Sequence, residues 1–171
     1  LQTVNPPNAS VGTAQLADSS VTSAKLGTGA TNTPAFRAYA GSAQTISDNT
    51  ATKAALDTEN FDTNSCYDTS TYRFTPNVAG KYYFNWVAQE NYTSSAATTI
   101  QIHIRKNGSD IAEAIDNTKG SEYGTLSVST TVIMNGSSDY VEFWLYFTGG
   151  SGVVWRPDRD RQFAEGFKII E

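Results

Sequence analysis

Few side chains in this sequence could take part in catalysis or hold a metal, and their spacing matches no known pattern of either kind. His103 is the only histidine and lies between isoleucines in an alternating run, so we interpret it as a surface residue of a strand. Cys66 is the only cysteine, and nothing in the sequence places His103 near it as a base. No nucleotide-binding loop, zinc spacing or paired-glycosidase motif occurs. We therefore expect no catalytic residues, no metal and no cofactor.

Acidic and amide side chains gather upstream of residue 70. The cluster comprises Asp57, Glu59, Asp62, Asn64 and Asp68. Calcium accepts such oxygen ligands, but the central Gly and terminal Glu of a helix–loop–helix calcium site are missing. Turn formation explains Asp and Asn residues here better, and calcium binding stays open as the alternative.

The most unusual segment runs from Trp155 to Arg161, where Arg and Asp alternate after a glycine-rich lead-in. These charges could pair with one another within or between chains. Alternatively, an exposed tryptophan beside charged side chains would stack on a sugar or an aromatic group. We favour the second interpretation, a binding surface.

Composition limits the classes of function. The chain has 171 residues and a net charge of −5, and no basic patch indicates nucleic-acid binding. No apolar run is long enough to span a membrane, and residues 1–8 lack the features of a signal peptide. We expect neither nucleic acid nor membrane insertion.

The elements that must position these residues are expected to be short strands, with no helix. Asn107-Gly108 and Asn135-Gly136 are typical of tight hairpins, because Asn-Gly supplies the positive φ angles that such turns need. The pattern predicts an all-β sandwich of about ten strands. The expected strands are 34–39, 44–46, 52–56, 71–75, 81–89, 98–106, 110–115, 123–134, 140–147 and 162–170.

Residues 1–33 differ in kind from the rest. The segment that begins at Asn8 matches the segment that begins at Asp18 at an offset of ten residues, with Val, Ala and Leu in matching positions. Copies from partner chains could stack these units around a thin shared core, whereas a flexible linker is the alternative. The repeat resembles those found just upstream of the tips of tailed-phage fibres. We expect an extended stalk over 1–33 and a head over 34–171.

Two expected strands carry aromatic residues on both faces. In 140–147 one aromatic row opposes an apolar row, and in 81–89 alternate rings also point in opposite directions. A two-sheet sandwich buries one face of each sheet, so a second aromatic face needs a partner. That partner is most simply another copy of the chain around a symmetry axis, and the alternative is that loops of the same chain cover the rings.

One stretch resembles a known family. From Phe74 the sequence reads Phe-Thr-Pro-Asn-Val-Ala-Gly-Lys-Tyr-Tyr-Phe-Asn-Trp, and matching positions continue upstream through Tyr67, Asp62 and Leu56. With the ending Phe163–Phe167, this is similar to the globular head of the complement recognition subunit, among the tumour-necrosis-factor-like jelly rolls. Leu56 replaces the usual Phe, and Trp86 the usual Phe or Tyr.

The resemblance implies a ten-strand jelly roll that forms a homotrimer through aromatic faces, and a structural role for Asp62. The residues expected at the trimer interface or in the core are Tyr82, Phe84, Trp86, Tyr140, Trp144, Tyr146, Phe163 and Phe167.

The jelly roll also implies that both termini of the head lie at one end. Counting strands then puts both Asn-Gly turns at this base, and the loops 90–97, 117–121 and 148–161 at the far tip. Loops on a rigid scaffold are where binding residues concentrate, and a trimer would present each of them three times. The candidate receptor-binding residues are Tyr92, Lys119, Trp155, Arg156, Asp158, Arg159, Asp160 and Arg161.

These observations favour a structural virion protein: a tailed-phage fibre whose stalk contacts other virion proteins and whose trimeric head binds a host-surface glycan or protein. The alternatives are a capsid-attached fibre or decoration protein, a secreted complement-like recognition protein and, as the enzyme option, a head that hydrolyses host polysaccharide. The expected location is the outside of a virus particle.

Overall fold

The computed structural model describes residues 20–22, 25, 31–89, 98–117, 125–149, 153–155 and 157–170. The chain divides into two compact units, Leu1–Thr31 with Ile170–Glu171, and Asn32–Ile169, and the second unit holds every described strand. No described helix is long and apolar enough to cross a membrane. The stalk predicted over 1–33 falls largely outside the described residues.

Thirteen strands make up the described secondary structure of the second unit, so the all-β prediction is confirmed. They are β1 (Ala35–Tyr39), β2 (Gln44–Ile46), β3 (Thr52–Lys53), β4 (Thr58–Asp62), β5 (Tyr67–Asp68), β6 (Arg73–Phe74), β7 (Gly80–Gln89), β8 (Thr99–Lys106), β9 (Ser109–Asp116), β10 (Thr125–Met134), β11 (Val141–Thr148), β12 (Val153–Trp155) and β13 (Gln162–Lys168).

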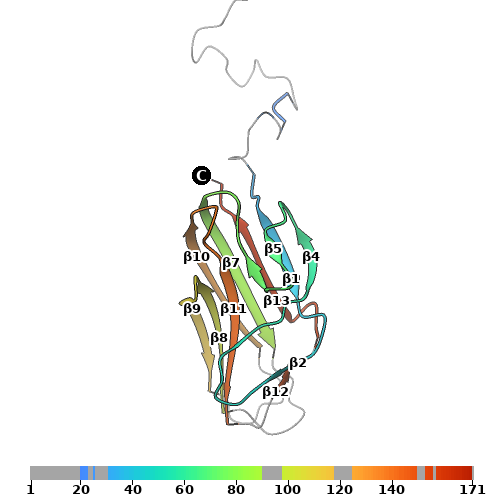
Figure 1. Ribbon diagram of the computed structural model, residues 1–171, viewed down its shortest axis with the longest axis vertical. Helices are drawn as coiled ribbons and strands as arrows, with labels where there is room; N and C mark the ends of the chain where they lie inside the picture. The colour runs from blue at the N-terminus through green and yellow to red at the C-terminus, as the bar shows by residue number, and fades with distance from the viewer. Residues whose placement is uncertain are drawn as a thin grey trace, which may run out of the picture. The chain divides into compact units, whose positions relative to one another are not determined.

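The strands form a two-sheet sandwich (Figure 1). The first sheet has the order β10-β7-β13-β1-β4. The second has the order β5-β6-β11-β8-β9, with β3 also paired to β11. β2 and β12 form a separate two-stranded ribbon at one end of the sandwich. All these pairings are antiparallel.

The core lies between the sheets, because alternate residues of each long strand point inward. In β7 the rings of Tyr82, Phe84 and Trp86 are fully buried. Phe36 of β1 stacks on Phe74 at 4.6 Å between ring centroids, which ties the first sheet to the second. Full burial of such side chains contributes about 1.5–3 kcal/mol each.

Three strands were missed by sequence reasoning: β4, β5 and β12. The first two lie in the acidic segment that we interpreted as turns, so that interpretation is wrong for Thr58–Asp62. β4 pairs with β1 at the edge of the first sheet, where its polar residues remain solvated. The structural role expected of Asp62 is confirmed, because its carboxylate accepts a hydrogen bond from the Tyr67 backbone N–H at 2.9 Å.

The two Asn-Gly turns differ. Asn107 and Gly108 have φ of 51° and 82° and join β8 to its neighbour β9, so this hairpin is confirmed. The hairpin predicted at Asn135-Gly136 is wrong, because β10 and β11 belong to different sheets. Asn135 Oδ1 accepts backbone N–H groups of the next residues, including Ser137 and Asp139 at 3.0 Å each. That side chain organises a crossover between sheets.

Both turns nevertheless lie at the end where the head begins and finishes. The Asn107 backbone N–H donates to the Tyr140 carbonyl at 3.1 Å, Met134 pairs with Gly80, and the Lys168 N–H donates to the Pro34 carbonyl at 3.0 Å. We call this the base end, and the opposite end, which holds Tyr39, Gln89, Thr125 and Gln162, the tip end. The predicted position of both turns at the base is therefore confirmed.

Candidate functional site

The predicted binding segment at the tip end divides into a buried part and an exposed part. Trp155 is 1% exposed, and its ring meets Trp86 edge-on at 5.7 Å between centroids. The expectation of an exposed tryptophan is therefore wrong. Pairing of β12 with β2 aligns Trp155 with Gln44, and this ribbon closes the core at the tip end.

The alternating charges that follow form a turn. Asp158 Oδ1 accepts the backbone N–H groups of Asp160 and Arg161 at 2.9 and 3.1 Å, and Arg161 Nη1 donates to Gln89 at 3.1 Å. Asp158 and Arg161 are thus occupied within the chain. Arg159 and Asp160 are exposed at the tip end. The other tip candidates, Tyr92, Lys119 and Arg156, lie outside the described residues.

The aromatic rows predicted at the trimer interface or in the core occupy three positions. Tyr82, Phe84 and Trp86 lie in the core. Tyr140, Trp144 and Tyr146 are half-buried on or beside β11 in the second sheet. Phe163 and Phe167 lie on the outer face of the first sheet, away from the core.

The outer face of the first sheet presents exposed apolar side chains. Phe61 is 48% exposed, Ile133 67% and Phe167 36%, and Tyr83 packs on Phe167 at 5.4 Å. Polar groups lie among them: Arg37 stacks over Phe163 at 3.7 Å. Sequence reasoning missed Phe61 because the strand β4 was not predicted.

Two of the half-buried rings of the second sheet, Tyr140 and Trp144, lie under cations of the same chain. Arg73 lies over Tyr140 with its guanidinium carbon 4.0 Å from the ring centroid, and Arg105 lies 4.4 Å over Trp144. Such contacts contribute about 0.5–1 kcal/mol at exposed sites.

Glu142 of β11 lies between these rings and is 2% exposed. Its carboxylate accepts hydrogen bonds from Lys53 Nζ and Arg73 Nε at 2.6 Å each and from Trp144 Nε1 at 3.2 Å. Burial alone would raise the pKa of Glu142, but these hydrogen bonds and the Lys53 charge outweigh burial and lower it. Sequence reasoning missed Glu142 because an acidic residue in an alternating strand gives no signal of burial.

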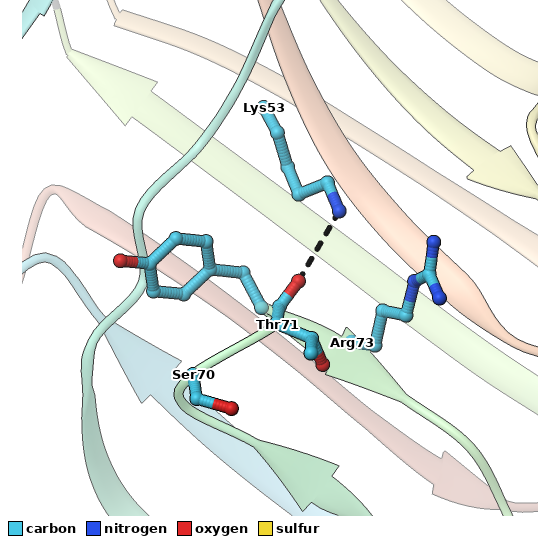
Figure 2. Close-up of a pocket in the computed structure, with 5 residues that line it drawn as sticks. Lys53, Ser70, Thr71 and Arg73 are labelled. Carbon is cyan, nitrogen blue, oxygen red and sulfur yellow. Dashed lines mark hydrogen bonds between the residues drawn. The ribbon is translucent and has the colours of Figure 1, made fainter.

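A pocket of about 350 Å³ opens beside this carboxylate, lined by Lys53, Ser70, Thr71, Tyr72 and Arg73. In the close-up, Lys53 reaches down to the Thr71 carbonyl, and its ammonium donates there at 3.2 Å (Figure 2). The pocket brings together residues of β3, of β6 and of the turn before β6.

The two residues first considered for chemistry are structural. His103 is 7% exposed, so its expected position on the surface is wrong, and its Nδ1 lies 3.6 Å from Asp110. Cys66 is buried, and burial raises the pKa of its thiol, which makes it a poor nucleophile. No cluster of His, Cys, Asp and Glu among the described residues could hold a metal ion.

Comparison with known proteins identifies the family. The sequence profile of the C1q domain matches residues 35–167. The chain belongs to the C1q domain family. Its fold is accordingly the two-sheet jelly roll of the C1q and tumour-necrosis-factor type, as the resemblance implied. C1q domains are non-catalytic binding modules that typically form trimers, so this chain is not an enzyme.

Solved structures show the same C1q-type fold at low sequence identity. The globular domain of the zebrafish complement 1qA protein is 16% identical, with a TM-score of 0.58 over 80% of this chain and 97% of that chain. Murine APRIL at pH 5.0 is 7% identical, with a TM-score of 0.62 over 79% and 98%. The tumour necrosis factor Eiger from S. frugiperda is 10% identical, with a TM-score of 0.56 over 79% and 91%. A search of curated proteins finds no match.

Proposed function

We propose that this C1q domain is the trimeric head of a tailed-phage fibre, which attaches the virus particle to a molecule on the host surface. The ten-residue repeat before the head supports a stalk that contacts other virion proteins. The observation that carries the trimeric part of the proposal is the exposed apolar face of the first sheet.

That face has the properties of an interface between copies of the chain. It combines exposed rings such as Phe61 and Phe167 with a central ion pair, Arg37 Nη1 to Glu165 Oε2 at 2.8 Å. Covering the rings with a second copy would remove apolar area from water at about 25 cal/mol per Å². Three copies around an axis would each use this one face.

Light scattering tests the trimer. The Phe61→Asp variant should give monomers at micromolar concentration, because a charge would be desolvated in the interface without a partner. Ile115→Asp is the matched control, because Ile115 is 47% exposed, close to the 48% of Phe61, but lies on β9 of the second sheet. A parent chain that is monomeric, or two variants that dissociate equally, would contradict the proposal.

Attachment is proposed to occur at the tip end, which lies opposite the entry of the chain into the head. Arg159 and Asp160 are exposed there. Arg159→Ala should weaken binding of purified heads to host cells while leaving the trimer intact, whereas Ser137→Ala at the base end should change binding little. Equal binding by both variants would remove Arg159 from the proposed surface. Imaging intact particles with the fibre labelled separates attachment to the tail from attachment to the capsid.

A further inference from the structure

The pocket beside Glu142 holds a guanidinium in a fixed position. Arg73 Nε is bound to the buried Glu142 carboxylate, and the plane of the group rests on Tyr140. Its side chain is 38% exposed, and no hydrogen bond to another described residue uses its two Nη atoms. A guanidinium held in this way presents a planar pair of N–H donors, which matches the geometry of a carboxylate.

The charged side chains around the pocket limit the charge that a ligand can carry. Lys53 and Arg73 supply two positive charges, and Glu142 and Asp68 supply two negative ones. Hydrogen bonds from Ser70 and Thr71 hold the pKa of Asp68 at about 2, so this carboxylate stays ionised at neutral pH. Because these four charges cancel, the pocket has no net positive charge to hold a dianion such as phosphate, and a carboxylate would be recognised through the local N–H donors of Arg73.

The other residues that line the pocket suit a sugar. Tyr72 has φ of 56°, a left-handed conformation that is strained for an aromatic residue and that persists mainly at functional sites. Its ring lines the pocket together with the hydroxyl-bearing residues Ser70 and Thr71. The Ser70 and Thr71 hydroxyls donate to Asp68 at 2.6 and 2.8 Å, which leaves their lone pairs to accept hydrogen bonds from the hydroxyl groups of a saccharide. An aromatic ring can pack on the apolar face of the same saccharide. The pocket volume also falls in the range of small-ligand sites, about 300–1,000 Å³.

We propose that this pocket binds a carboxylate-bearing sugar, with the carboxylate on Arg73 and the sugar ring against Tyr72. The site lies on the second sheet and depends neither on the proposed trimer face nor on the exposed tip residues. The sugar-binding proposal can therefore fail while the proposed fibre role stands, and the fibre role can fail while the sugar-binding proposal stands.

A ¹⁵N NMR titration of the full chain tests the site with three probes: methyl β-D-glucuronide, its neutral analogue methyl β-D-glucoside, and acetate. The glucuronide should shift the signals of residues 70–73 with a dissociation constant of about 1 mM. The glucoside and acetate should each bind at least about tenfold more weakly, because each lacks one of the two recognition elements. No shift with the glucuronide, or equal binding of either control probe, overturns the proposal.

Variants locate the contact. Arg73→Gln should weaken glucuronide binding about tenfold, and Arg73→Lys should not restore it, because an ammonium lacks the paired donors. Lys81→Gln is the control for loss of one positive charge, because Lys81 is exposed on β7 of the first sheet, whereas the pocket lies on the second sheet. Unchanged affinity in Arg73→Gln, or an equal loss in Lys81→Gln, overturns the assignment.

A second variant covers the case in which Arg73→Gln fails to fold. Tyr72→Asn should raise the thermal midpoint, because Asn tolerates the left-handed conformation, and should weaken glucuronide binding severalfold by removing the ring. A variant that is more stable and binds the sugar as well as the parent would show that Tyr72 does not contact it, and would overturn the proposed pose.

Discussion

Glu142→Gln should lower the free energy of unfolding of the head, because it neutralises a buried carboxylate that three donors surround. The substitution conserves volume, so no cavity forms. Lys53 and Arg73 each lose an ionised acceptor at 2.6 Å, and the glutamine oxygen retains at most part of these bonds. The change therefore isolates the charge.

The magnitude follows from the two charge-assisted bonds, which contribute about 1.5–3 kcal/mol each. Complete loss of one partner of a buried pair costs about 3–5 kcal/mol. Here the side chains of Lys53 and Arg73 are 25% and 38% exposed, so water compensates part of the loss. We expect a net destabilisation of about 2–4 kcal/mol.

Urea unfolding, followed by tryptophan fluorescence at a fixed protein concentration, measures this difference. The midpoint should fall by about 1–2 M with an unchanged slope. Glu113→Gln is the control, because the Glu113 side chain is 57% exposed and its loss should cost less than about 1 kcal/mol. A Glu142→Gln midpoint within the range of this control would refute the reasoning.

The pH dependence gives an independent check. Because the pKa of Glu142 is lowered below the ordinary value of 4.5, its contribution is present above that value and is lost as pH falls through the folded-state pKa. The difference in stability between the parent and Glu142→Gln should therefore shrink as pH falls below 4.5. A constant difference between pH 7 and acid would contradict this.

Three further outcomes are expected. Gly136→Ala should destabilise the head by more than about 2 kcal/mol, because Gly136 has φ of 71° and an added Cβ would overlap the backbone of Val78 and Ala79. Gly108→Ala is the control and should cost about 1 kcal/mol, because Gly108 has φ of 82° but open space around the added Cβ. Equal losses of stability for the two variants in denaturant melts would contradict the contact with Val78 and Ala79. Trp155→Ala should destabilise by about 3–5 kcal/mol through loss of core packing, and a thermal midpoint like that of the parent would show that the ring is not buried. Removing residues 1–31 should leave the head folded, because every described strand lies in the other unit. A circular dichroism spectrum showing that the remaining chain is unfolded would disprove this division.

Local patterns predicted much of the fold. Alternation identified the long strands β7, β8, β10, β11 and β13 to within a few residues, because the period of two along a strand is a property of neighbouring residues. The Asn107-Gly108 hairpin followed from two residues that adopt positive φ. The short strands β4, β5 and β12 escaped prediction, because edge and closing strands contain too few residues for alternation to be recognised.

The candidate sites depended more on distant contacts. Sequence alone indicated that Trp155 to Arg161 is unusual and that β11 carries rings on both faces. Only the tertiary structure shows that pairing with β2 buries Trp155, and that Arg73 and Arg105 cover Tyr140 and Trp144 from other strands.

The sequence by itself thus determined the strand class, the family and the absence of a recognisable catalytic motif, since these follow from local periodicity and contiguous signatures. The tertiary structure decided which faces stay exposed and where charge is buried. Phe61, Glu142 and the pocket at Tyr72 and Arg73 became visible only when strands far apart in the chain were paired. Burial and hydrogen bonding across the sandwich depend on those long-range pairings, which no local pattern encodes.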